Sequence, residues 1–161
     1  MKLELNKVYY REIENLAVGD IPKEQLIEIF KDGRVSCHFL QPQLNIWFPE
    51  TKFVDAKGYD HEWLKEDGIT RLIEQKGYNQ SGANYRPSGQ LGMGRTPNDQ
   101  EIIDFIDENS LVYVITDNYD FPKIRIRFIE GKELLQLYPN FKISVAEREN
   151  FFGEHPRSIL H

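Results

Sequence analysis

The segment that most constrains the fold is the apolar run SLVYVIT, residues 110–116. It shows no alternation of polar and apolar side chains, which is typical of a strand buried on both faces. We therefore expect it near the centre of a sheet that carries covering layers. A chain of 161 residues is long enough to bury one sizeable core, so we predict a single domain over residues 1–161.

Helical patterns occur before and after this run. One helix is predicted within GDIPKEQLIEIFKDGR. The stretch VSCHFLQPQLNIWF is predicted to be helical in part, with a break or a new first turn at Pro42. Shorter helices are predicted over DQEIIDFIDEN and KELLQLYP.

Strand patterns lie between these helices. Asp67-Gly68 is a signal for a two-residue hairpin turn, which would pair Glu66 with Ile69. The segment KIRIRFIEG alternates as a half-exposed strand does. Together these patterns predict an α/β or α+β domain with a central mixed β-sheet flanked by helices.

The hairpin carries the clearest candidate chemistry of the chain. In the predicted register Asp60 lies opposite Gln75, beside Glu74 and Lys76, which point to one face of their strand. Facing and diagonal neighbours on paired strands lie within about 5–8 Å, so two carboxylates could share a hard cation such as Mg²⁺. A solvated hairpin with ordinary surface charges is the alternative, because 29% of the residues are charged.

Charge is distributed unevenly along the chain. The net charge of −6 argues at first against a nucleic-acid partner. However, residues 75–98 contain no Asp or Glu, whereas Lys76, Arg86 and Arg95 lie within them. The glycine-rich part of this stretch, residues 79–97, is predicted to be a loop, and the stretch could present a local positive surface to an anion.

The pattern resembles the catalytic core of the PD-(D/E)xK nuclease superfamily, and within it the small type II restriction endonucleases. In that family an Asp begins the second strand of the core and a Glu and a Lys follow on the third. The matching residues here are Asp60 in GYD, and Glu74 and Lys76 in EQK. The resemblance spans roughly residues 20–140, with Tyr59 where the family has Pro.

The resemblance implies a restriction-endonuclease-like core and Mg²⁺-dependent hydrolysis of double-stranded DNA at a specific site. Asp60, Glu74 and the main-chain carbonyl of Gln75 would hold the metal, and Lys76 would position the attacking water. A chain with one active centre would need a second copy to cut both strands, so we expect a homodimer.

The loop that follows would contact the DNA through side chains suited to base edges, sugars and phosphates. These candidate DNA-binding residues are Asn79, Gln80, Asn84, Tyr85, Arg86, Ser88, Gln90 and Arg95. In the family the first helix often supplies a further acid near the metal. The matching stretch offers Gln41, Gln43 and, further on, Glu50, and that role stays unassigned.

Other residues are interpreted as structural. Cys37 is the sole cysteine, which excludes an intramolecular disulfide and fits a reducing cytoplasm. His61 is expected on the strand face opposite Asp60, in a structural role. Arg125 and Arg127 are expected on a solvated strand face, with contact to a phosphate backbone as the alternative.

Neither a signal peptide nor an apolar run long enough for a membrane span is recognised, so we expect a cytoplasmic protein with no membrane partner. Two other functions remain open from the residues alone. One is a DNA-binding or specificity module without catalysis. The other is an acidic interaction protein, such as a nuclease inhibitor, in which the negative charge would be the operative feature.

Overall fold

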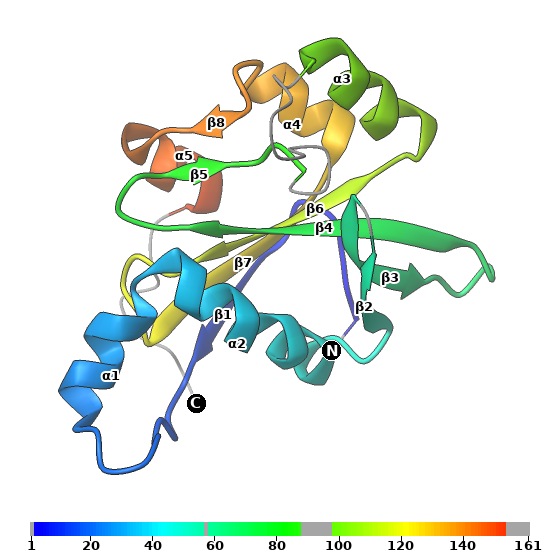
Figure 1. Ribbon diagram of the computed structural model, residues 1–161. Helices are drawn as coiled ribbons and strands as arrows, with labels where there is room; N and C mark the ends of the chain where they lie inside the picture. Colours follow the sequence, from blue (N-terminus) through cyan, green and yellow to red (C-terminus); the bar gives the residue numbers. More distant parts are fainter. Residues whose placement is uncertain (1, 57, 88–97, 154–161) are drawn as a thin grey trace.

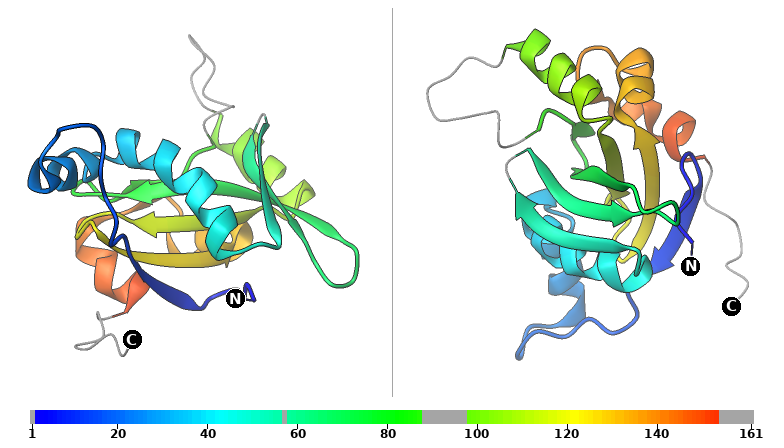
Figure 2. Two further views of the ribbon diagram at one scale, coloured as in Figure 1. Left: turned by 90° about the horizontal axis from the view of Figure 1, so that it is seen from below. Right: turned by 90° about the vertical axis from the view of Figure 1, so that its right-hand side faces the viewer.

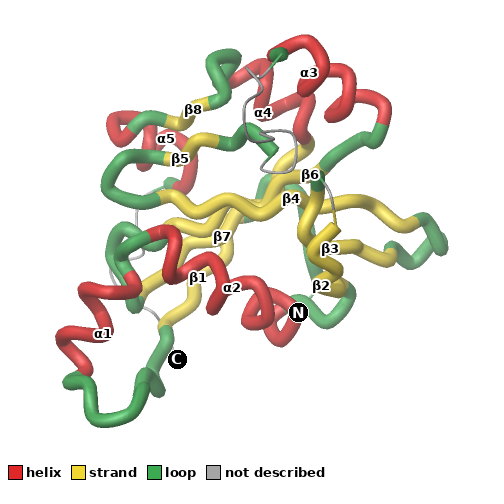
Figure 3. The backbone as a smooth tube through the Cα atoms, viewed as in Figure 1, coloured by secondary structure: helices red, strands yellow, loops and turns green. Residues whose placement is uncertain are grey.

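A computed structural model describes residues 2–56, 58–87 and 98–153. Its main sheet has six strands in the order β1-β7-β6-β4-β3-β2 (Figures 1 and 3). The strands are β1 (Val8–Glu12), β2 (Thr51–Ala56), β3 (Tyr59–Leu64), β4 (Thr70–Tyr78), β6 (Val112–Asp117) and β7 (Lys123–Glu130). Strands β4 and β6 are parallel, and the other neighbours are antiparallel. The predicted mixed sheet is confirmed.

Helices cover both faces of this sheet (Figures 1 and 2). The helices are α1 (Lys23–Phe30), α2 (Gly33–Trp47), α3 (Asp99–Glu108), α4 (Gly131–Leu137) and α5 (Arg148–Phe152), with a 3₁₀ turn at Val145–Glu147. α1 and α2 pack on one face, and α3, α4 and α5 pack on the other. A small second sheet pairs β5 (Ala83–Asn84) with β8 (Lys142–Ile143). Within the described ranges, none of the helices has the length and apolar character that crossing a membrane requires.

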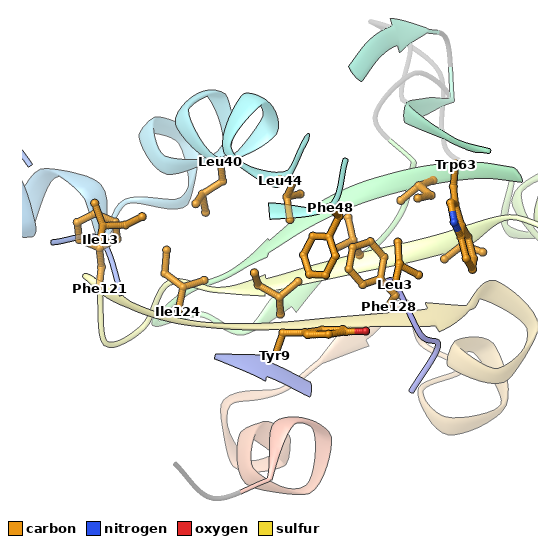
Figure 4. Close-up of a cluster of buried hydrophobic side chains, with 14 of the residues drawn as sticks. Leu3, Tyr9, Ile13, Leu40, Leu44, Phe48, Trp63, Phe121, Ile124 and Phe128 are labelled. Atoms are coloured by element: carbon orange, nitrogen blue, oxygen red, sulfur yellow. The ribbon is translucent and has the colours of Figure 1, made fainter. Parts of the chain in front are cut away.

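Each face of the sheet has its own hydrophobic cluster. Leu40 and Leu44 of α2 pack toward the face that carries Phe128 (Figure 4). The second cluster joins α3 and α4 to the other face of the sheet. Ile73 of β4 belongs to the first cluster and Tyr78 to the second, as the alternation of side chains along a strand requires.

Strand β6 has the central place expected of the apolar run. It lies between β4 and β7, and all of its residues are buried. Since a strand covered on both faces has no solvated side, the run needs no polar alternation.

Helix α2 passes through Pro42 without a break, so the expected interruption is wrong. The side chain of Asp32 caps this helix by accepting a hydrogen bond from the Arg34 amide at 2.9 Å. Leu40 and Leu44 flank the proline and are both buried in the first cluster. Their packing stabilises a helical path that the local sequence alone disfavours.

The hairpin turn is one residue longer than expected. The Lys65 amide donates to the Ile69 carbonyl at 3.1 Å, and Gly68 has φ +79°. Residues 66–68 therefore form a loop with a glycine in the left-handed region, a common hairpin alternative to the two-residue turn. Leu64 then pairs with Thr70, which shifts the register by one residue from the predicted pairing.

The arginines of β7 are not on a solvated face, and the expectation of a half-exposed strand is wrong. Arg125 is fully buried and donates to Asp117 at 2.8 Å and to Glu149 of α5 at 2.9 Å. Arg127 donates to the Phe151 carbonyl at 2.6 Å. Helix α5, which the sequence patterns did not predict, covers this face and engages both guanidinium groups.

Replacing Arg125 with Met is therefore expected to lower the free energy of unfolding by about 3 kcal/mol or more, because it removes one partner of the buried ion pair with Asp117. Urea unfolding at neutral pH measures this difference. Lys132→Met is the control: its ammonium pairs with Asp107 at an exposed site, and the expected change is within about 0.5 kcal/mol. Equal stability losses in the two variants would contradict the structural role of Arg125.

Candidate functional site

The paired part of β3 and β4 ends next to the candidate acids. The described ladder runs from Leu64 and Thr70 to His61 and Ile73. One step further in this register, Asp60 stands opposite Glu74. The longer loop therefore places Asp60 opposite Glu74, whereas the predicted register placed it opposite Gln75.

Asp60 bonds to the main chain of β4 at this point. Its Oδ2 accepts a hydrogen bond from the Gln75 amide at 2.8 Å. The amide and carbonyl of one strand residue point to the same neighbouring strand, so the Gln75 carbonyl lies along the edge that Asp60 approaches. A carboxylate oxygen and a main-chain carbonyl, both ligands that Mg²⁺ accepts, therefore lie along one edge of β4.

Glu74 and Lys76 form a shielded ion pair on the face of β4 that the second cluster covers. Lys76 Nζ lies 2.7 Å from Glu74 Oε1, and their side chains are 12% and 3% exposed, respectively. Neighbouring strand positions on this face contribute Leu72 and Tyr78 to the second cluster. The pair is therefore part of the sheet interior rather than of a solvated hairpin, while Asp60 and Lys76 keep partial access to solvent.

The opposite face of the same strand carries a polar set beneath α2. The Gln75 side-chain oxygen accepts from His61 Nε2 at 2.9 Å, and the other ring nitrogen lies 3.4 Å from Asn45 Nδ2. Burial is the main cause of the lowered pKa of His61, which keeps the ring neutral. As expected, His61 lies on the face away from the acids and has a structural role. It bonds to the side chain of Gln75, the residue between Glu74 and Lys76 in the sequence.

Two further residues border the site, and the sequence patterns did not place them there. Tyr113 of β6 is fully buried and faces Glu74 across the parallel ladder. Cys37 of α2 lies within electrostatic reach of Asp60 and Lys76, and burial raises the pKa of its thiol. Only the pairing of distant segments reveals these neighbours. Gly58, just before β3, has φ +90°, and an added Cβ there would lie 2.8 Å from a ring atom of Phe105 in α3. The start of β3 therefore requires a glycine.

The first part of the predicted DNA-contacting loop is ordered by turns. Asn79 Oδ1 accepts from the Ser81 amide at 2.8 Å, and Asn84 Oδ1 accepts from the Arg86 amide at 3.1 Å. Gln80 is exposed. The stretch is thus shaped by side chains that close turns on their own main chain.

Two of the candidate DNA-contacting residues are engaged inside the protein. Tyr85 is fully buried in the second cluster and its hydroxyl donates to the Tyr138 carbonyl, so its ring is a core element and the expectation of contact with DNA is corrected. Arg86 lies over the Phe141 ring and pairs with Asp99 at 3.1 Å. The remaining candidates, Ser88, Gln90 and Arg95, lie outside the described residues.

The further acid near the metal has no structural candidate in Glu50. Its main-chain carbonyl accepts from the Leu64 amide at 3.1 Å. Leu64 is the last residue of β3, so this contact lies at the end of the strand that is remote from Asp60. Gln41 and Gln43 lie on α2. Over the described ranges, no group of three or more His, Cys, Asp or Glu side chains gathers to hold a metal ion.

Comparison with protein-family models, curated proteins and solved structures finds no match to this chain.

The buried imidazole of His61 makes stability depend on pH. Because the folded-state pKa is lowered, the unfolded chain takes up this proton at higher pH than the folded protein does. The stability that the neutral His61 ring contributes is therefore fully present above pH 6.5, the ordinary pKa of histidine. It falls as the pH drops below this value, by up to about 1.4 kcal/mol per pH unit. Urea unfolding between about pH 7.5 and about pH 5.5 should show this slope in the wild type and a smaller one in His61→Gln. Identical slopes would contradict the assignment.

Proposed function

We propose that this protein is a Mg²⁺-dependent endonuclease with a restriction-endonuclease-like core, which hydrolyses phosphodiester bonds at a specific site in double-stranded DNA. The observation that carries the proposal is the arrangement at the end of the β3–β4 ladder. There Asp60 bonds to the main chain between Glu74 and Lys76, which form a shielded pair. The strand positions agree with those that the nuclease resemblance implies: the Asp is the second residue of β3, and the Glu and the Lys lie on β4.

The donor set fits a hard divalent cation. Asp60 and Glu74 offer carboxylate oxygens, and the Gln75 carbonyl lies on the edge that Asp60 approaches. Mg²⁺ takes one or two carboxylates from a protein and keeps several waters, so two acids and a carbonyl are sufficient. When bound, the ion would polarise the scissile phosphate and lower the pKa of a coordinated water.

The residues of the chain would divide the remaining work. Glu74, which is 3% exposed, presents a carboxylate held in a fixed place by its surroundings. Lys76 is paired with that carboxylate, so it lies within reach of any water that Glu74 helps to hold. There its ammonium group would orient the attacking water and offset negative charge that develops on the phosphate. His61 would keep the intervening Gln75 in place from the opposite face.

The DNA would approach from the side where Asp60 and Lys76 are partly exposed. Gln80, an exposed residue shortly after β4, is suited to contact a base edge or a phosphate. One site of this kind cuts one strand. We propose a homodimer, because two copies related by a two-fold axis would present one site to each strand of a symmetric sequence.

Conservative replacements of the candidate residues test the activity. Plasmid DNA of known sequence is incubated with Mg²⁺, and the ends of the products are read. Asp60→Asn, Glu74→Gln and Lys76→Ala are each expected to lower the cleavage rate by roughly 100-fold or more, because each removes charge that acts on the reacting phosphate. Lys76→Ala should still bind DNA in a gel-shift assay with Mg²⁺. Lys132→Ala, at an exposed ion pair of α4, is the control.

The outcomes separate the alternative functions. If the wild type cuts and a chelator stops it, while the Asp60 and Glu74 variants cut as fast as the wild type, the site is wrongly assigned. DNA binding without metal and without cleavage would identify a binding module. If the protein neither binds nor cuts DNA, the proposal fails, and an interaction with a protein partner becomes the function to test.

A further inference from the structure

Tyr113 of β6 has a buried hydroxyl group that lacks a hydrogen-bond partner among the described residues. The whole residue is inaccessible to solvent. Its ring packs edge-on against Tyr85 in the second cluster, with ring centroids 5.4 Å apart. Buried hydroxyls in native proteins are nearly always paired, because leaving one unpaired is destabilising. The group therefore needs a partner in some state of the protein.

Glu74 is a polar residue placed to be that partner. The two residues face each other in the parallel ladder of β4 and β6, on the same face of the sheet. Burial raises the pKa of Tyr113, and the negative charge of Glu74 raises it further, so the two groups lie within electrostatic reach. The phenol consequently stays protonated and remains a hydrogen-bond donor.

We propose that Tyr113 is a positioning residue for Glu74, whose carboxylate receives the tyrosine hydroxyl as a hydrogen-bond donor when Glu74 serves a divalent cation. This inference rests on the proposed metal site. It adds a residue from a third strand to a set that otherwise comes from β3 and β4.

The ion pair explains why a neutral donor suits this carboxylate. Lys76 Nζ now lies 2.7 Å from Glu74 Oε1. When Glu74 Oε1 serves a cation, Lys76 becomes available to the water and no longer donates to this oxygen. A neutral hydroxyl can replace that donor without the charge repulsion that an ammonium group would exert on the cation. Groups that orient metal-binding carboxylates in this way are common around metal sites.

Two tyrosine variants on the same face of the sheet test the proposal. Tyr113→Phe is expected to weaken Mg²⁺ binding by about 10-fold or more. The melting temperature without metal should stay the same or rise, because the variant removes an unpaired polar group. Isothermal titration calorimetry with Mg²⁺ and thermal unfolding measure these effects in the full chain without DNA.

Tyr78→Phe is the matched control. Tyr78 is equally buried, but its hydroxyl donates to the Ser144 carbonyl at 2.8 Å. Its loss is expected to lower the melting temperature by about 2–4 °C, with Mg²⁺ affinity unchanged. Tyr113→Phe should therefore lower the Mg²⁺ affinity without lowering the melting temperature, and Tyr78→Phe should do the reverse.

The remaining results would overturn the inference and show which step failed. If Tyr113→Phe binds Mg²⁺ as tightly as the wild type while Glu74→Gln binds it more weakly, the role of Tyr113 is wrong and the metal site stands. If Glu74→Gln binds Mg²⁺ as the wild type does, or if the wild type binds none, the proposed function fails and the inference fails with it. If Tyr113→Phe melts as far below the wild type as Tyr78→Phe, the hydroxyl has a structural partner instead.

Discussion

The parallel pairing of β4 with β6 is the constraint on which the rest of the structure depends. Antiparallel neighbours can be joined by a tight turn, but parallel strands need a crossover. Here the crossover contains β5 and α3, and it places α3 on the face opposite α2. The pairing also sets Tyr113 beside Glu74. The two layers and the lining of the candidate site thus have a common origin.

The ladder of β3 and β4 ends next to the candidate acids, Asp60 and Glu74. Within a sheet, main-chain amides and carbonyls are paired with the neighbouring strand. Beyond His61 and Ile73, the Gln75 amide takes the Asp60 carboxylate as its acceptor instead. Glu74 has an ammonium partner on the same strand. Both acids therefore have defined donors before any cation binds, and such preorganisation limits the rearrangement that binding requires.

The sequence predicted the features that follow from local periodicity, and it failed where distant segments decide. Residues 110–116 were placed correctly because an apolar strand needs cover on both faces. The alternation of β7 predicted a solvated face for Arg125, yet α5 lies there and supplies Glu149. Pro42 predicted a break, yet packing on the sheet keeps α2 continuous.

The proximity of the three candidate residues was predicted from the sequence, but their pairing was not. Asp60, Glu74 and Lys76 do come together, because the hairpin pairs their strands and the observed register sets Asp60 opposite Glu74, on the face that Glu74 shares with Lys76. Their pairing was shifted by one residue, since Asp-Gly permits both the two-residue turn and the longer loop with Gly68 in the left-handed region. Tyr113 could not be found from the sequence, because its place depends on the parallel pairing.

The arginine contacts bear on how an acidic protein could bind DNA. Arg86 pairs with Asp99, and Arg125 and Arg148 both pair with Asp117. These guanidinium groups are thus partly or fully neutralised by acids of the same chain. Affinity for DNA at the site would then depend chiefly on a cation that offsets the charge of the acids. A nuclease built in this way should bind DNA more tightly with a divalent cation than without one, whereas a module that binds through a basic surface would not need the cation.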